Sequence, residues 1–156
     1  MTGGCSCGAV RYRLLDTPLI VHCCHCLNCQ RQTGSAFVIN AIVESDRVEL
    51  SGDDPVVVDV ARDDGSVQRI YRCPHCQVAL MSEYGRPLAK FVRAGTLDDP
   101  AAIEPDVHIY VRSKLPWVQL PDDALAFDGI YEMDQVWSAS SLERVAAASA
   151  RQEGTA

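Results

Sequence analysis

The sequence lacks any long apolar run, a leader-like N-terminal segment and an excess of basic residues. No stretch of about 18 consecutive apolar residues occurs, so no transmembrane helix is expected. Residues 1–8 carry neither a basic segment nor an apolar core, so no signal peptide is expected there. These two absences favour a cytoplasmic location, in which thiols stay reduced.

Basic side chains are outnumbered by acidic ones. The chain has 14 Lys and Arg against 21 Asp and Glu, a formal net charge of −7. Nucleic-acid-binding surfaces are usually basic, and anionic membranes repel acidic proteins, so neither partner is expected. A small anionic ligand held by a few arginines remains compatible with this charge. The sequence carries no indication of an oligomeric state.

The 156 residues contain no linker, repeat or low-complexity tract, which favours one domain. We expect a mostly β, single-domain zinc fold with short helical turns, covering residues 1–130. Residues 131–156 are expected to form a C-terminal extension, with a peripheral helix at 141–152 and a disordered end. Apolar alternation and β-branched runs predict strands at 9–15, 19–23, 36–43, 46–50, 56–60, 67–72, 78–84, 88–94 and 107–111. Turns are predicted at 63–66 and 85–87.

Eight cysteines in a reducing compartment indicate metal binding rather than disulfides. Four of these cysteines form two closely spaced pairs, and the two pairs lie far apart in the sequence. Cys5 and Cys7 form a C-x-C pair, and Cys73 and Cys76 form a C-x-x-C pair. Together they supply the four sulfurs of a closed, structural zinc site, which would contribute directly to folding.

A second group consists of Cys24, Cys26 and Cys29, spaced C-x-C-x-x-C. In extended chain, residues two apart project to the same face, so Cys24 and Cys26 can point together. A tight turn or first helical turn then brings the sulfur of Cys29 back toward them. Three protein ligands leave one tetrahedral position of zinc for a substrate, as in catalytic sites.

Spacing alone leaves another reading of this second group open, in which a fourth protein ligand closes the site. The candidates for that ligand are Cys23, His22, His25, His75 and His108. Cys23 is the poorest of them, because in extended chain it points away from the face of Cys24. A closed site would be structural, whereas an open, thiolate-rich zinc would suit activating an incoming thiol or polarising a small carbonyl.

The residues after Cys29 offer hydrogen-bond donors. A short turn capped by Gly34 would present backbone N–H groups, and Arg31, Thr33 and Ser35 add side-chain donors. These four residues are candidates for holding a carboxylate of a small ligand. An ordinary solvated turn is the competing interpretation.

Three segments together resemble the glutathione-dependent formaldehyde-activating enzyme family, which includes centromere protein V-type proteins. They are Gly3–Tyr12 (GGCSCGAVRY), Cys24–Phe37 (CHCLNCQRQTGSAF) and Cys73–Cys76 (CPHC). The later Pro105–Tyr110 and Lys114–Trp117 fit the same pattern, so the resemblance spans roughly residues 3–128.

The resemblance implies a β-tent fold with two zinc ions per chain. It places a structural zinc on Cys5, Cys7, Cys73 and Cys76 and a catalytic zinc on Cys24, Cys26 and Cys29. It also implies a carbon–sulfur lyase that joins glutathione, or a similar small thiol, to formaldehyde or another small aldehyde.

One position departs from the family pattern, and one other class of function competes. Gln77 stands where the family usually has glycine after the second C-x-x-C cysteine, and glutamine enters a left-handed backbone conformation only with strain. The competing class is a non-catalytic, zinc-stabilised glutathione or thiol carrier, or a protein-interaction module.

Overall fold

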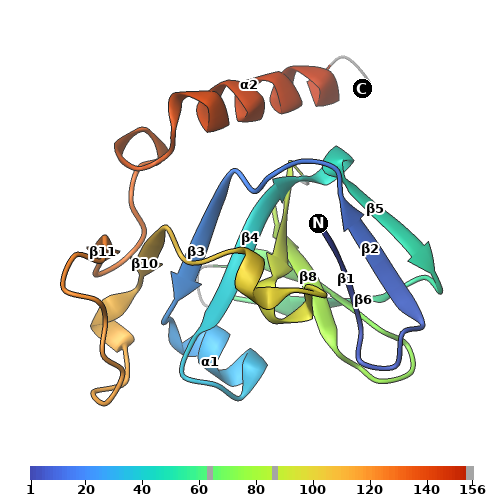
Figure 1. The fold of residues 1–156 in the computed structure, drawn as a ribbon, viewed down its shortest axis with the longest axis horizontal. Coiled ribbons are helices and arrows are strands. Elements are labelled where there is room, and N and C mark those ends of the chain that lie inside the picture. The colour runs from blue at the N-terminus through green and yellow to red at the C-terminus, as the bar shows by residue number, and fades with distance from the viewer. Residues whose placement is uncertain (63–64, 86–87, 154–156) are drawn as a thin grey trace.

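Two β-sheets carry most of the chain in the computed structural model, which describes residues 1–62, 65–85 and 88–153. The smaller sheet has the strand order β1 (Thr2–Gly4), β2 (Val10–Leu14), β5 (Val48–Gly52). The larger sheet has the order β11 (Ala126–Phe127), β10 (Val107–Ile109), β3 (Ile20–Cys24), β4 (Val38–Glu44), β9 (Ala89–Arg93), β8 (Ala79–Tyr84), β7 (Val67–Arg72), β6 (Val56–Ala61). In Figure 1 the strands β3 and β4 slope one way and β2 and β5 the other, which gives a tent-like outline.

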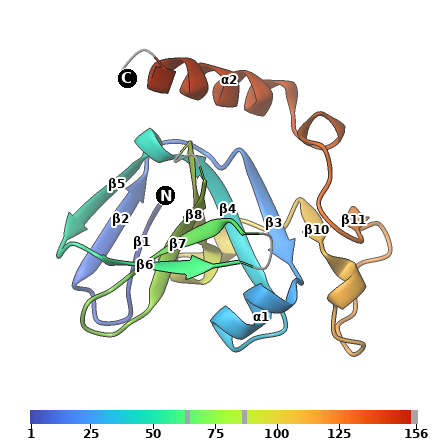
Figure 2. The ribbon, with the colours of Figure 1, turned by 180° about the vertical axis from the view of Figure 1, so that it is seen from behind.

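The helices are few and mostly short. α1 (Leu27–Thr33) follows β3, and α2 (Ala139–Glu153) ends the described chain. Single 3-10 turns occur at Ser45–Arg47, Ala94–Thr96, Pro100–Ala102, Val111–Ser113 and Met133–Gln135. Figures 1 and 2 place α1 and α2 at opposite ends of the sheets. The expected mostly β, single-domain fold with short helical turns is confirmed.

Each predicted strand is present; the strand at 67–72 has the predicted ends, and the ends of the others are shifted. The strand predicted at 46–50 begins at Val48, because Ser45–Arg47 forms a 3-10 turn. The strand predicted at 107–111 ends at Ile109, because Tyr110 has a left-handed φ of 58° and opens another 3-10 turn. Strands β1 and β11 have only three and two residues, too few to produce a periodic signal.

Strand β4 separates two hydrophobic cores, because both of its faces are buried. Ala41 and Val43 pack with Val10, Tyr12 and Leu14 between the two sheets. On the opposite face, Val38 and Ile42 pack with Leu19, Ile20, Val107 and Ile109. The cysteines divide in the same way: Cys5 and Cys73 lie in the first core and Cys24 and Cys29 in the second. The fold therefore places the two cysteine groups on opposite sides of β4.

The C-terminal segment contains the expected helix, here residues Ala139–Glu153. A domain boundary at residue 130 stays a prediction. The expected disordered end lies partly outside the described residues, as do parts of the turns predicted at 63–66 and 85–87. Within the described chain, α1 and α2 are both too short or too polar to span a lipid bilayer.

Candidate metal centres and the adjoining cavity

Four cysteines from two distant turns converge on one point. Cys5 and Cys7 lie between β1 and β2, and Cys73 and Cys76 lie between β7 and β8. The Cys7 sulfur is 3.5 Å from that of Cys5 and 3.6 Å from that of Cys73, and all four sulfurs lie within 4.8 Å of one another. Zinc with Zn–S bonds of about 2.3 Å places its sulfurs about 3.8 Å apart, so this donor set fits one tetrahedral zinc.

Backbone amides orient two of these sulfurs. Val10 N donates to Cys5 Sγ at 3.3 Å, and His75 N donates to Cys73 Sγ at 3.4 Å. Such hydrogen bonds stabilise thiolates and fix the direction of metal ligands. The two amides also join each cysteine turn to the strand or turn beside it, as expected of a structural site.

Gln77 keeps the left-handed conformation that glycine would adopt. Its φ is 61°, and its amide N donates to Cys73 O at 3.1 Å, which closes the turn. Its side-chain Nε2 donates to Pro74 O at 3.0 Å, and Arg72 Nη1 donates to Gln77 O at 3.0 Å. The turn is therefore closed with glutamine at this position, and the side-chain hydrogen bond to Pro74, which glycine would lack, offsets part of the strain.

The second group, Cys24, Cys26 and Cys29, also converges. Cys24 ends β3, Cys26 is the N-cap of α1, and Cys29 lies in the first turn of that helix. Cys29 N donates to Cys26 Sγ at 3.3 Å, and the three sulfurs lie within 4.8 Å of one another. The strand-to-helix transition thus brings the three thiols together, and the donor set fits a zinc held by three sulfurs.

None of the alternative fourth ligands joins this group within the described chain. Cys23, His25 and His108 form a separate group, in which His25 Nε2 lies 3.6 Å from Cys23 Sγ and 3.0 Å from His108 Nδ1. His22 Nε2 is hydrogen-bonded to Tyr131 Oη at 2.5 Å, and His75 bonds Asp53 beside the other cysteine group. Three donors leave the fourth tetrahedral position to a ligand from outside the chain.

The protonation of the three thiols is uneven. Hydrogen bonds from Cys24 and Cys29 lower the pKa of Cys26 to about 2, and backbone amides of α1 act in the same direction. The pKa of Cys24 is raised by its hydrogen bonds to Cys26 and Cys29 and by burial. The group therefore favours a thiolate among its three sulfurs, which is the form that binds a cation.

A buried arginine lies behind these thiols. Arg93 on β9 is 6% exposed and lies opposite Asn40 on the neighbouring strand β4, donating from Nη1 to Asn40 Oδ1 at 2.6 Å. Among the described residues its Nε has no hydrogen-bond partner and no carboxylate pairs with it. The pKa of Cys29 is raised to about 11. The hydrogen bond to Cys24 lowers this pKa, whereas the hydrogen bond to Cys26 and burial raise it. The positive charge of Arg93 acts against the increase. A buried charge requires an opposite charge, and the deprotonated cysteine group supplies one.

A cavity of about 430 Å³ adjoins the three thiols. Cys24, Cys26 and Cys29 line one end of it. Its walls continue along the same faces of β3 and β4, through His22, Asn40, Ile42 and Glu44, to residues of the C-terminal segment. Cavities of this size accommodate small organic ligands.

The four residues predicted to bind a carboxylate lie outside the lining of this cavity. Thr33 Oγ1 donates to Cys29 O at 2.8 Å, and Gly34 ends α1 with φ 63° and donates to Gln30 O. Arg31 and Ser35 are exposed. The predicted cap at Gly34 is confirmed, while the binding role of Arg31, Thr33, Gly34 and Ser35 stays a prediction.

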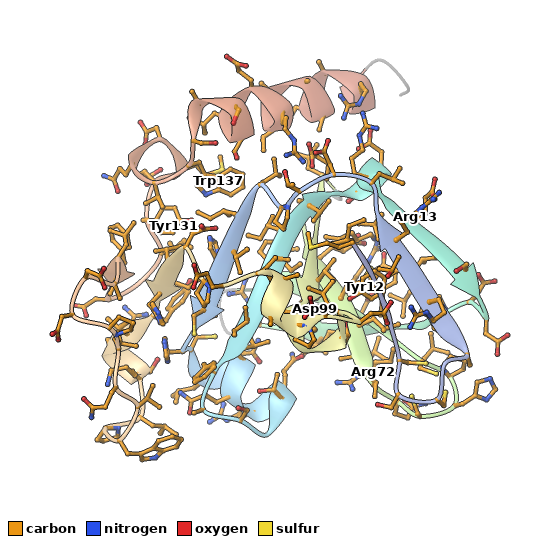
Figure 3. The ribbon with its side chains drawn as sticks, viewed as in Figure 1. Tyr12, Arg13, Arg72, Asp99, Tyr131 and Trp137 are labelled. Carbon is orange, nitrogen blue, oxygen red and sulfur yellow. The ribbon has the colours of Figure 1, made fainter. Side chains whose placement is uncertain are left out.

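Several residues of this region carry no signal in the sequence. Arg93 looks like an ordinary strand residue, and only its pairing with Asn40 places it behind the thiols. Tyr131 and Trp137 lie between β3 and α2 in Figure 3, within a segment without a recognisable motif. Sequence periodicity does not detect such contacts, because they join residues 53 and 109 positions apart.

Comparisons with known proteins point to one family. The family model described as glutathione-dependent formaldehyde-activating enzyme matches residues 1–113. A protein of Halomonas elongata, provisionally named a glutathione-dependent formaldehyde-activating enzyme, is 28% identical over 126 residues, which are 77% of this chain and 80% of that protein. A Rhodobacter sphaeroides protein of known crystal structure has the same fold, with a TM-score of 0.50, 19% identity, and coverage of 67% of this chain and 92% of that one.

Proposed function

Because the chain belongs to the glutathione-dependent formaldehyde-activating enzyme family, we propose that it is a zinc-dependent carbon–sulfur lyase. It adds the sulfur of glutathione, or of a similar small thiol, to a small aldehyde. The observation that carries this proposal is the convergence of three thiols, without a fourth described donor, at the end of a cavity.

The chain's own residues prepare the site for this reaction. Zinc held by Cys24, Cys26 and Cys29 would favour the thiolate form of an incoming thiol and polarise a carbonyl. Cys26 already favours the thiolate, and Arg93 offsets part of the negative charge that three thiolates accumulate. Burial of Cys24 and Cys29 limits access of water to their sulfurs, which strengthens these electrostatic effects.

The proposed reaction is an addition without a change of oxidation state. The thiol loses its proton, and its sulfur forms a bond with the carbonyl carbon while the C=O π bond breaks. The carbonyl oxygen takes up the proton, which gives a hemithioacetal such as S-(hydroxymethyl)glutathione. The reverse reaction is the elimination of the aldehyde. Arg31, Thr33, Gly34 and Ser35 remain our candidates for anchoring a carboxylate of the thiol.

The variant Cys26→Ala tests this proposal, with Cys23→Ala as its control. Both remove a buried or half-buried thiol from the same segment, but only Cys26 belongs to the three-cysteine group. Adduct formation from glutathione and formaldehyde, followed by exchange NMR, should fall at least about a hundredfold in Cys26→Ala and stay near the wild-type rate in Cys23→Ala. Equal rates in the two variants would contradict the proposal.

The same experiment distinguishes an enzyme from a carrier. A carrier would bind glutathione and lose that binding in Cys26→Ala, yet the wild type would not accelerate adduct formation. A purely structural second zinc is disfavoured, because no fourth protein donor joins the group in the described residues.

A further inference from the structure

The cavity beside the thiols is elongated and mostly apolar. Its walls follow β3 and β4 from Cys24, opposite Val38, to Glu44, which is six residues further along β4. At about 3.4 Å per residue, this path is about 20 Å long. Large apolar side chains such as Leu19, Ile42 and Phe91 line it. Its shape therefore suits a chain or a ring with an apolar surface.

The far end of this cavity is built by residues beyond the part that defines the family. The family model ends at residue 113. Ile130, Met133, Trp137, Val145 and Ala148 line the cavity and all follow that point. We call these five residues the roof. One wall of the cavity thus belongs to the C-terminal segment of this chain.

Specific hydrogen bonds hold the roof segment against the sheet. Trp137 Nε1 donates to Tyr131 Oη at 2.9 Å, and Tyr131 in turn bonds His22 on β3. The buried Ser141 Oγ donates to Leu19 O at 2.7 Å. Figure 3 shows Tyr131 and Trp137 on the side of α2 that faces the sheet. These bonds fix the position of the roof above the cavity.

The cavity offers little to a highly charged ligand. Among the lining residues that the structure describes, only Glu44 and Arg62 are of the acidic or basic types Asp, Glu, Lys and Arg. Glu44 is bound by Arg144, whose Nε and Nη2 lie 2.8 and 2.7 Å from its carboxylate. The Arg62 guanidinium lies 5.1 Å from the centre of the Tyr84 ring. Glutathione carries a carboxylate at each end, and the lining residues that the structure describes do not provide two cationic sites for them.

We propose that the aldehyde substrate of this protein carries an extended apolar chain or ring, which occupies the cavity between the three thiols and the roof. The proposal rests on the lyase function above and names the class of its carbonyl substrate. The carbonyl carbon lies at the thiol end and receives the sulfur, and the carbonyl oxygen receives the thiol's proton. The apolar substituent extends along β3 and β4 toward Val145 and Ala148.

Chain length provides the first test. The zinc-loaded protein is assayed with glutathione and with formaldehyde, propanal, pentanal or octanal. Each buried methylene should raise kcat/KM about fourfold, until the chain fills the cavity. Binding of the unreactive octanamide, compared with acetamide by titration calorimetry, supplies a readout that does not depend on turnover. Octanamide should bind at least about a hundredfold more tightly.

Variants of the roof provide the second test. Ala148 is buried and lines the cavity, whereas its neighbour Ala147 is exposed on the same helix. Ala148→Phe should fill part of the cavity, reduce the preference for octanal over propanal at least about tenfold and weaken octanamide binding. Ala147→Phe should leave both unchanged. If Ala148→Phe does not fold, Val145→Ala replaces it and should shift the preferred aldehyde to a longer chain.

The outcomes separate this inference from the function on which it rests. Turnover of formaldehyde without any gain from longer chains, together with equal binding of octanamide and acetamide, would overturn the inference and leave the lyase function intact. Turnover of none of the aldehydes would overturn the lyase function, and the substrate proposal would fall with it. If Ala148→Phe and Ala147→Phe changed the chain-length preference equally, the proposal that the roof contacts the aldehyde's apolar substituent would be wrong.

Discussion

At the residue scale, Gln77 holds a backbone conformation that its side chain disfavours. Its φ of 61° lies in the left-handed region, which costs a non-glycine residue about 1–2 kcal/mol. We expect Gln77→Gly to raise the free energy of unfolding, because the strain is relieved. The rise should be only about 0.5–1 kcal/mol, because the side-chain hydrogen bond to Pro74 is lost. Denaturant unfolding of the zinc-loaded protein measures this change.

At Gly34, which has almost the same φ, the opposite change from glycine to a residue with a Cβ can be tested. Its φ is 63°, and a Cβ there would meet no other atom within 4 Å. Gly34→Ala should therefore lower the free energy of unfolding by about 1 kcal/mol through backbone strain alone. If both substitutions moved stability in the same direction, strain would not explain either.

Arg93 leads to a prediction about metal affinity. Its buried guanidinium has no carboxylate partner among the described residues and faces the side of β4 that carries the three thiols. Arg93→Met should lower the zinc affinity of the three-cysteine group about tenfold or more. Competition with a chelator measures it, with Arg13→Met at an exposed surface position as the control. Equal affinities in two folded variants would exclude this role.

At the scale of elements, the two cysteine groups connect different parts of the fold. The first joins the β1–β2 turn to the β7–β8 turn, whereas the second lies within the single connection from β3 to α1. Structural zinc contributes on the order of 10 kcal/mol, which is comparable to the whole stability of a small domain. Cys73→Ala should therefore unfold the protein, and Cys26→Ala should leave the fold in place.

Near-ultraviolet circular dichroism and thermal unfolding distinguish these two outcomes. The Cys73→Ala protein should lose its tertiary signal, while the Cys26→Ala protein should retain a cooperative transition. A comparable loss of structure in both variants would show that the two groups do not have separate structural and catalytic roles.

The elements themselves could largely be predicted from the sequence. Strands such as β2 and β4 contain alternating or continuous apolar residues, because one or both of their faces are buried. The cap of α1 at Gly34 follows from the need for a left-handed residue there. The end of β10 could not be predicted, because it depends on the φ of Tyr110, a residue that normally favours strands.

At the scale of the whole molecule, the convergence of thiols could be predicted and the cavity could not. Cysteine spacing constrains where Cys24, Cys26 and Cys29 point, because a strand and a helical turn have fixed geometry. The roof depends on long-range contacts such as Ser141 to Leu19 and Arg144 to Glu44. Local periodicity does not reveal these contacts, so only the folded chain shows that α2 lines the cavity.

We propose that the second zinc is held by three cysteines and accepts a thiol from outside the chain. With four thiols in one group and three in the other, two zinc ions average fewer than four protein sulfurs each. X-ray absorption at the zinc edge, recorded with and without glutathione, counts these ligands. We expect the average number of sulfurs per zinc to rise toward four when glutathione is added. An average that glutathione does not change would contradict it.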